Sequence, residues 1–399
     1  MQALKYIQWV IVLLLGLQIN SSQSNESKFV LAADCPRGFE LVPGEGCRLR
    51  SLYQFYSSNQ NRGVGGTRTG LPPVRDGYTP QQIDLGRYLF FDPVLSADET
   101  ISCAACHQPE QGFTDGQAVA TGIYGRRGRR SAPSLWNVAF NPKLNWDARV
   151  ESLEQQAQGP LYNNDEMGNT PTELLARLQA VQTYQALFNQ AFPETGLTLP
   201  NLYTALAAFQ ASLISLNSRY DQYAHGDHDA LNADELAGLN VFRSFVARCS
   251  ECHTPPLFTN NQIAVIGVPE PDGVPFDVGA EKTFAAAKLR GGFKVPTLRN
   301  ITRTAPYMHS GVFADLREAT EFYNLGRGHA APDELQIHWH ITSPELKQQE
   351  IDQIVAFMQA LTDERFLPDV PTSVPSGLAV NLNHNQDGQK LALHQRTRP

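Results

Sequence analysis

Two copies of the pattern C-x-x-C-H constrain this chain more than any other feature. They occupy residues 103–107 (CAACH) and 249–253 (CSECH). The two thiols of such a motif reach the two vinyl groups of one haem, and the histidine that follows lies beneath the iron. A zinc site or a redox dithiol also uses paired cysteines, but neither explains a histidine at the same offset twice. The sequence therefore predicts two covalently attached c-type haems, whose attachment and iron-ligating residues are Cys103, Cys106, His107, Cys249, Cys252 and His253.

The N-terminus predicts export. Lys5 precedes an apolar stretch at 7–17, which is shorter than the roughly 20 residues that a membrane span needs. Residues 1–33 are therefore expected to be a signal peptide for the periplasm or another exported location, with an uncleaved anchor as the alternative. The mature chain is not expected to span a membrane. Outside the two motifs only Cys35 and Cys47 remain, and in an oxidising compartment they would form a disulfide rather than stay as two free thiols.

The hydrophobic pattern predicts a mainly α-helical fold of two cytochrome c-like haem domains packed together, with long loops and few short strands. Residues 34–78 form an irregular N-terminal extension, 79–230 the first haem domain, 231–365 the second, and 366–399 an extended or disordered tail. One strand is expected at 262–266. The expected helices cover residues 80–90, 171–188, 202–216, 233–246 and 344–361.

The net charge of the chain excludes one class of binding partner. The formal net charge is −8, which argues against nucleic acid because binding to phosphates requires a basic surface. A short basic run interrupts this acidic balance, and it is either a solvated loop or an anchor for haem propionates or a partner. It consists of Arg126, Arg127, Arg129 and Arg130.

The stretch from residue 86 to about 363 resembles the bacterial di-haem cytochrome c peroxidase family, which includes MauG and MbnH. The resemblance rests on pieces that follow one another in family order over about 280 residues. They are LGRYLFFDPVLSADETISCAACHQPEQGFTDG, SAPSLWN, NWDARVESLEQQAQGPLYNNDEMG, CSECHTPPLFT, FKVPTLRNITRTAPYMHSGVFADLREATEFYNLG and IVAFMQALTD.

The resemblance implies that the first haem is high-spin and reacts with hydrogen peroxide. Its distal pocket would hold Gln156 and Glu166, with Pro160 between them. A carboxylate there takes a proton from one peroxide oxygen and delivers it to the other, and the amide orients the peroxide. Trp146 corresponds to the tryptophan that passes electrons between the two haems. Without the resemblance, Glu166 would be an ordinary loop acid and Trp146 a core residue.

The second haem is expected to be six-coordinate, and here the chain departs from ordinary peroxidases of the family. Their distal methionine lies fourteen residues after the histidine of the P-Y-x-H-x-G motif, which is His309; that position is Tyr323. The resemblance to MauG implies a tyrosinate ligand, a hard donor that stabilises oxidised iron. Met308 is the alternative ligand.

The resemblance has two further implications, one for access to the first haem and one for a calcium ion. Many family members carry a histidine in the loop after the first motif that caps the iron until the second haem is reduced, but residues 108–140 contain no histidine. The peroxide site is therefore expected to be open in the resting protein. A calcium ion between the domains would use carbonyls of Thr304 and Pro306, while Ser131 replaces the usual asparagine.

Three functions are compatible with these features. The first is oxidation, by hydrogen peroxide, of a tyrosine or tryptophan in a separate exported protein, with Trp339 as either an exit residue for electrons or a packing residue. The second is removal of peroxide with a small redox protein as electron donor. The third is a non-enzymatic carrier with two low-spin haems. The tyrosine at position 323 and the missing loop histidine favour the first.

Overall fold

The computed structural model describes residues 29–56, 70–326, 334–363 and 365–382. The described residues form a mainly helical fold with two short antiparallel sheets, which confirms the expected fold class. None of the described helices is long and apolar enough to cross a membrane. Most of the expected leader, residues 1–28, lies outside the described residues, as does the end of the tail from residue 383.

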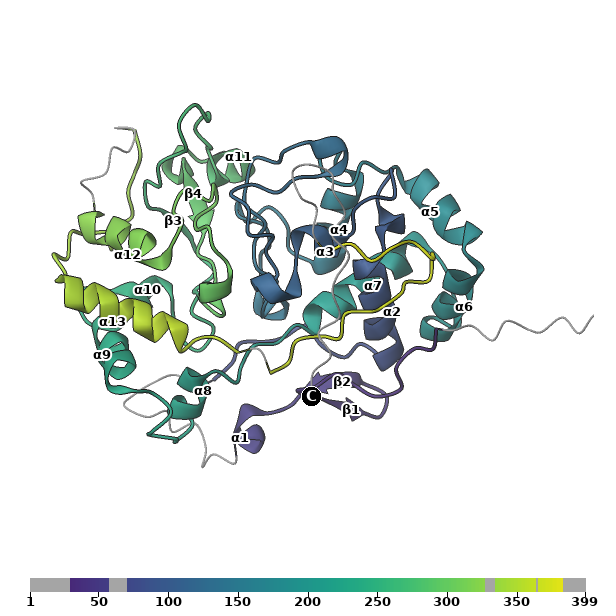
Figure 1. Ribbon diagram of the computed structural model, residues 1–399, viewed down its shortest axis with the longest axis horizontal. Coiled ribbons are helices and arrows are strands. Elements are labelled where there is room, and N and C mark those ends of the chain that lie inside the picture. Colours follow the sequence, from purple (N-terminus) through teal and green to yellow (C-terminus); the bar gives the residue numbers. More distant parts are fainter. Residues whose placement is uncertain (1–28, 57–69, 327–333, 364, 383–399) are drawn as a thin grey trace, which may run out of the picture.

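Two helical halves lie side by side in Figure 1, the blue and teal half on the right and the green and yellow half on the left. The first half contains α2 (Pro80–Phe91), α3 (Cys103–Cys106), α4 (Leu153–Tyr162), α5 (Pro171–Ala180), α6 (Gln182–Ala191) and α7 (Leu199–Ala211). The second contains α8 (Arg219–Ala224), α9 (Ala233–Phe242), α10 (Cys249–Cys252), α11 (Ala280–Phe284), α12 (Leu316–Leu325) and α13 (Gln348–Gln359). The short sheets pair β1 (Phe39–Val42) with β2 (Gly46–Leu49) and β3 (Ile263–Val265) with β4 (Gly292–Lys294).

Each half is built around a crossing of two helices, and a glycine makes each crossing close. α2 packs on α7, and α9 packs on α13. A Cβ on Gly86 would lie 1.9 Å from the carbonyl oxygen of Ala205, and one on Gly238 would lie 1.8 Å from that of Gln353. Only glycine lets the two backbones approach this closely. In both halves the one-turn helix that carries the C-x-x-C-H motif follows the first helix of the crossing.

Three of the five expected helices begin at the expected residue, namely Pro80, Pro171 and Ala233, whereas the helices expected at 202–216 and 344–361 span Leu199–Ala211 and Gln348–Gln359. The Thr79 side chain accepts from the amide of Gln82, and the Gln82 side chain accepts from the amide of Thr79, so both ends of a capping box are made at α2. Thr170 accepts from the amide of Glu173 at the start of α5.

The single helix expected at 171–188 is wrong, because it is two helices. Val181 is extended (φ −93°, ψ 100°) and separates α5 from α6. Leu178 is the last buried apolar residue of α5, and Tyr184 is the first of α6. In one continuous helix, a spacing of six residues would place these two side chains on different faces. The break at Val181 restores the register, so that both helices bury their apolar faces in the same core.

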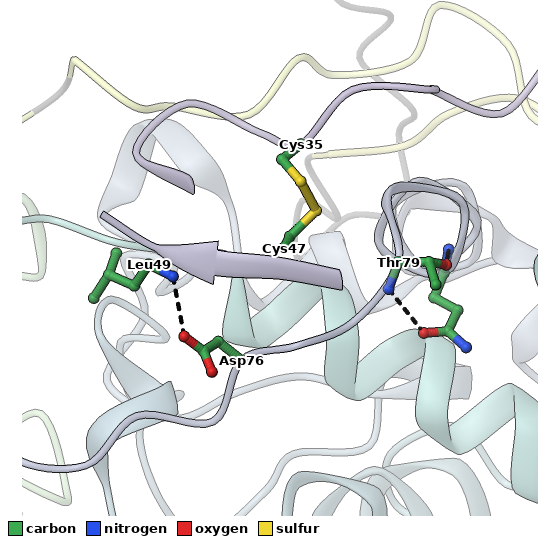
Figure 2. Close-up of a disulfide and its surroundings, with 6 residues drawn as sticks. Cys35, Cys47, Leu49, Asp76 and Thr79 are labelled. Carbon is green, nitrogen blue, oxygen red and sulfur yellow. Dashed lines mark hydrogen bonds between the residues drawn. A yellow bond between two sulfur atoms is a disulfide. The ribbon is translucent and has the colours of Figure 1, made fainter. Parts of the chain in front are cut away.

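The N-terminal extension is more regular than its composition suggested. β1 and β2 form a hairpin, and the disulfide between Cys35 and Cys47 ties it to the preceding segment, as the sequence predicted. Figure 2 shows this disulfide beside Leu49, whose amide donates to the Asp76 carboxylate (3.0 Å). The hairpin is thereby joined to the chain that leads into α2 at Thr79.

Both ends of the described chain pack on the first half. Leu31 is buried in the core that α2 shares with α5 and α6, and the amide of Ala32 donates to the Asp84 carboxylate (2.9 Å). The tail returns along the same half as an extended strand-like segment, drawn in yellow in Figure 1. Val374 is buried there, and the Ser376 hydroxyl donates to Asp92 (2.6 Å).

The helix crossings generate a stability prediction. Replacing Gly86 or Gly238 with alanine forces a methyl group against a backbone carbonyl, and each change is expected to lower the free energy of unfolding by about 1–3 kcal/mol. Gly159→Ala in α4 is the matched control, because nothing lies within 4 Å of its Cβ position. It is expected to raise stability by up to about 1 kcal/mol through helix propensity. Urea unfolding followed by circular dichroism measures all three. Equal effects at the three positions would contradict the close crossing.

Candidate active site

The histidine of each C-x-x-C-H motif is held by a backbone carbonyl. Nδ1 of His107 donates to the carbonyl oxygen of Phe113 (2.9 Å), and Nδ1 of His253 lies 3.2 Å from those of both Phe258 and Pro296. A neutral ring that donates from Nδ1 has its lone pair on Nε2, which is the geometry that a histidine ligand of iron needs. Burial lowers the pKa of His107, and it lowers that of His253 to about 4, so both rings stay neutral.

The acceptor carbonyls come from residues with unusual backbone angles. Phe113 has φ 62° and Phe258 has φ 56°, values that a bulky residue rarely adopts. Both rings are fully buried, and their packing holds the strained turns in place. In each half, therefore, the carbonyl of a buried phenylalanine with positive φ orients the motif histidine.

A cavity of about 270 Å³ runs from the second motif to the boundary between the halves. Its lining includes Cys249, Cys252 and His253 of the second motif together with Trp146 and Gln156. The wall is mostly apolar, and its described residues include Lys294 and Arg248 but no aspartate or glutamate. An apolar cavity with cations and no acids suits a flat, apolar ligand that carries carboxylates, which is the chemistry of haem.

The residues expected on the distal side of the first haem come from α4 and the loop after it. Gln156 and Pro160 lie one turn apart on α4, and the Pro160 carbonyl accepts from the amide of Met167 (3.1 Å). Glu166 follows in the loop, where its carboxylate accepts from Asn163 Nδ2 (2.8 Å). Burial raises the pKa of Glu166 above its usual value. The negative charge of Glu166 also contributes to the raised pKa of Cys106, so this carboxylate lies close to the first motif.

Trp146 lies at the boundary between the halves. Its indole N–H donates to the Ser131 carbonyl (2.9 Å), and its own carbonyl accepts from the amide of Lys294 (2.7 Å) in β4. Its ring meets Phe293 edge-on at 6.5 Å, and Phe293 in turn stacks on His309 at 3.9 Å. These contacts fix the ring of Trp146 at the boundary between the halves.

Tyr323 lies on α12 and lines the cavity at the second motif. Burial raises the pKa of its phenol, and the neighbouring Cys252 and Cys249 raise it further. No hydrogen bond of this phenol is found within the described part of the chain. A phenol that lines this cavity without a partner among the described residues, close to both haem-attaching thiols, fits an iron ligand. Met308 lines the same cavity from a loop, where it has φ 71°.

The residues expected to bind calcium lie together along the wall between the halves. Ser131, Thr304 and Pro306 all line the cavity. The Ser131 carbonyl already accepts from Trp146, and its amide donates to the carbonyl of His309 (2.7 Å). Among the described residues, no group of three or more His, Cys, Asp or Glu side chains could hold a metal ion, so a calcium site there would depend on carbonyl and hydroxyl oxygens.

The basic run divides into two parts. Arg126, Arg127 and Arg129 are exposed, which agrees with a solvated loop. Arg130 instead makes two bonds to Asp277 (2.7 and 2.9 Å) and one to Asp147 (2.8 Å). Because Asp277 belongs to the second half, Arg130 joins the two halves beside Phe293, over whose ring its guanidinium lies at 5.4 Å.

Several of these residues were not found from the sequence alone. The carbonyls of Phe113 and Phe258 carry no side-chain signal, although a phenylalanine follows each motif at nearly the same distance. His309 was used only as a landmark, but it is buried and its Nε2 lies 3.0 Å from the Glu270 carboxylate. That partner comes from a loop 39 residues away, which no local pattern indicates.

Comparisons with known proteins identify the family to which the chain belongs. A family model described as di-haem cytochrome c peroxidase matches residues 80–229. The cytochrome c551 peroxidase of Nitrosomonas europaea is 33% identical over 318 residues, which cover 78% of this chain and 90% of that protein. The methylamine utilization protein MauG of Methylorubrum extorquens is 34% identical over 306 residues, which cover 75% and 84%.

A solved structure gives the same result. The crystal structure of a MauG-like protein associated with microbial copper homeostasis superimposes with a TM-score of 0.68 at 30% identity, and the match covers 77% of this chain and 99% of that one. The two motifs, the paired helix crossings and these relatives lead to one conclusion: the chain belongs to the di-haem cytochrome c peroxidase and MauG family and is a peroxidase-type oxidoreductase.

Proposed function

We propose that this enzyme uses hydrogen peroxide to oxidise a tryptophan or tyrosine residue of a separate exported protein. The observation that carries the proposal is the position of Tyr323, whose buried phenol faces the attachment site of the second haem and has no other partner within the described residues. A tyrosinate ligand stabilises oxidised iron, which disfavours rapid reduction by a small redox protein. It favours an enzyme that retains its oxidising equivalents until a protein substrate supplies the electrons.

The haems supply the redox-active iron at which peroxide is reduced to water. Within the chain, Glu166 acts as the proton carrier, taking the proton of one peroxide oxygen and delivering it to the oxygen that leaves. Asn163 holds the Glu166 carboxylate by a hydrogen bond of 2.8 Å. Gln156 orients the peroxide through its amide, and Pro160 on the same helix shapes the distal wall.

Electron transfer between the two sites runs through Trp146. The Ser131 carbonyl fixes its indole and Phe293 packs against its ring, so little reorganisation accompanies transfer. Trp339 is the proposed point of contact with the protein substrate. It is 64% exposed, which disfavours a packing role, and its ring lies 3.6 Å from that of His340, which lines the cavity.

The Cys35–Cys47 disulfide supports an exported, oxidising location. The packing of Leu31 and Ala32 on the first half favours signal cleavage before Phe29 rather than at the end of the leader expected at residues 1–33. We also propose a calcium ion at Ser131, Thr304 and Pro306, where it would hold the boundary between the halves.

Peroxide removal with a small redox protein as electron donor is the second candidate, because one relative is named a cytochrome c551 peroxidase. One experiment separates the two. The purified oxidised protein is mixed with peroxide, and candidate exported proteins are then added and analysed by mass spectrometry. A mass change at a tryptophan or tyrosine that requires both enzyme and peroxide supports the proposal. Rapid turnover with a reduced small cytochrome, without any protein modification, would replace it with the second candidate.

The role of Glu166 generates a kinetic prediction. Glu166→Gln removes the proton carrier and is expected to slow the reaction with peroxide by roughly 10²–10⁴-fold. Because burial raises the pKa of this carboxyl, the wild-type rate is expected to fall on acidification already above the usual pKa of a glutamic acid, as the base becomes protonated. The variant is expected to lose this acid limb. Stopped-flow absorbance across pH measures both effects, and Glu110→Gln, an exposed acid, is the control. An unchanged rate in Glu166→Gln would exclude this role.

The ligand assignment generates a spectroscopic prediction. The resting ferric protein is expected to give one high-spin and one low-spin signal in electron paramagnetic resonance, and Tyr323→Met is expected to change only the low-spin signal. Tyr307→Phe is the control, because Tyr307 lines the same cavity but donates its hydroxyl to the Ile301 carbonyl (3.1 Å). A low-spin signal that is indifferent to Tyr323 but altered in a Met308 variant would transfer the ligand to Met308.

A further inference from the structure

Lys294 is a cation without a partner among the residues that the structure describes. It ends β4 and lines the cavity at the second motif. No hydrogen bond or ion pair of its ammonium group is found among the described residues. Burial alone lowers its pKa to about 8, with no acid nearby to oppose that shift. Lys294 is half-buried in the cavity wall, and an ammonium group that is partly desolvated with no carboxylate in that wall is stabilised by a bound anion.

Two other cations of the described residues, the buried Arg299 and the half-buried Arg130, are both paired with acids. Arg299 is fully buried and donates to Asp221 (2.7 Å) and to the Pro256 carbonyl. Arg130 is held by Asp277 and Asp147. Lys294 differs from both because no aspartate or glutamate is present among the described residues that line its cavity. A negative charge beside Lys294 would therefore be supplied by a molecule bound in the cavity.

The position of Lys294 on the chain indicates which molecule this is. Two residues later, the Pro296 carbonyl accepts from Nδ1 of His253, so this segment runs along the site of the second haem. On the other side, the amide of Lys294 donates to the carbonyl of Trp146. The haem attached at Cys249 and Cys252 carries two propionate carboxylates and is the anion-bearing group expected in this cavity.

We propose that Lys294 binds a propionate of the haem attached through Cys249 and Cys252, and that its positive charge raises the reduction potential of that haem. Ferric haem carries one more positive charge than ferrous haem. A nearby cation therefore destabilises the oxidised form more than the reduced form. Lys294 would thus partly offset the low potential that a tyrosinate ligand imposes.

The proposal rests on haem attachment at the second motif and does not depend on the substrate proposed above. Its test is the reduction potential of each haem in the full-length holoprotein, measured by spectroelectrochemistry without peroxide or protein substrate. Lys294→Gln is expected to lower the potential of the second haem with a smaller effect on the first, while Lys294→Arg is expected to stay near wild type. Lys288→Gln is the matched control, because it makes the same charge change at an exposed residue of the neighbouring segment.

Two results would overturn the proposal. One is an equal reduction potential of the second haem in Lys294→Gln and Lys288→Gln, and the other is a shift of potential confined to the first haem. If Lys294→Gln fails to retain haem, the test uses Lys294→Arg, which keeps the positive charge. Loss of haem or a lower reduction potential of the second haem in Lys294→Arg would also overturn the proposal. The infrared difference spectrum between the two redox states gives an independent readout. A carbonyl band of a protonated propionate is expected to appear in Lys294→Gln and to be absent in Lys294→Arg.

Discussion

The orientation of each motif histidine by a phenylalanine carbonyl is the constraint on which the two sites depend. α3 and α10 are four residues long, and a single helical turn is not stable by itself. The bond from His107 to Phe113 closes the first motif onto its loop, and the bond from His253 to Phe258 does the same in the second. Both loops require a left-handed phenylalanine, and only burial of its ring sustains that conformation.

The helix crossings supply the rigid body to which these loops are attached. Gly86 and Gly238 bring α2 against α7 and α9 against α13. The apolar faces of each pair then form a core on one side of the motif helix, with Phe209 in the first half and Phe357 in the second. The two halves therefore repeat one plan: a helix, a motif with its phenylalanine turn, and a returning helix that closes the core.

The boundary between the halves combines aromatic stacking with charge pairing. Phe293 from the second half lies between Trp146 and Arg130 of the first, and Arg130 binds Asp277 across the boundary. The free energy lost when these charges are removed from water offsets most of the free energy gained from their ion pairs. The main effect of the network is therefore to specify one arrangement of the halves. A fixed arrangement keeps the ring of Trp146 in one position relative to both sites, as the proposed electron transfer requires.

The sequence by itself determined the chemistry of attachment and much of the local structure. The motif spacing indicates two haems, the cap at Thr79 gives the start of α2, and two leftover cysteines predict the disulfide, because each depends on residues close together in the chain. Only the tertiary structure decided what surrounds each group. The break at Val181, the bond between His309 and Glu270, and the isolation of Lys294 in a cavity without acids depend on which distant segments meet. Hydrophobic periodicity describes one element at a time, whereas the partner of a buried polar group is chosen by the packing of all of them.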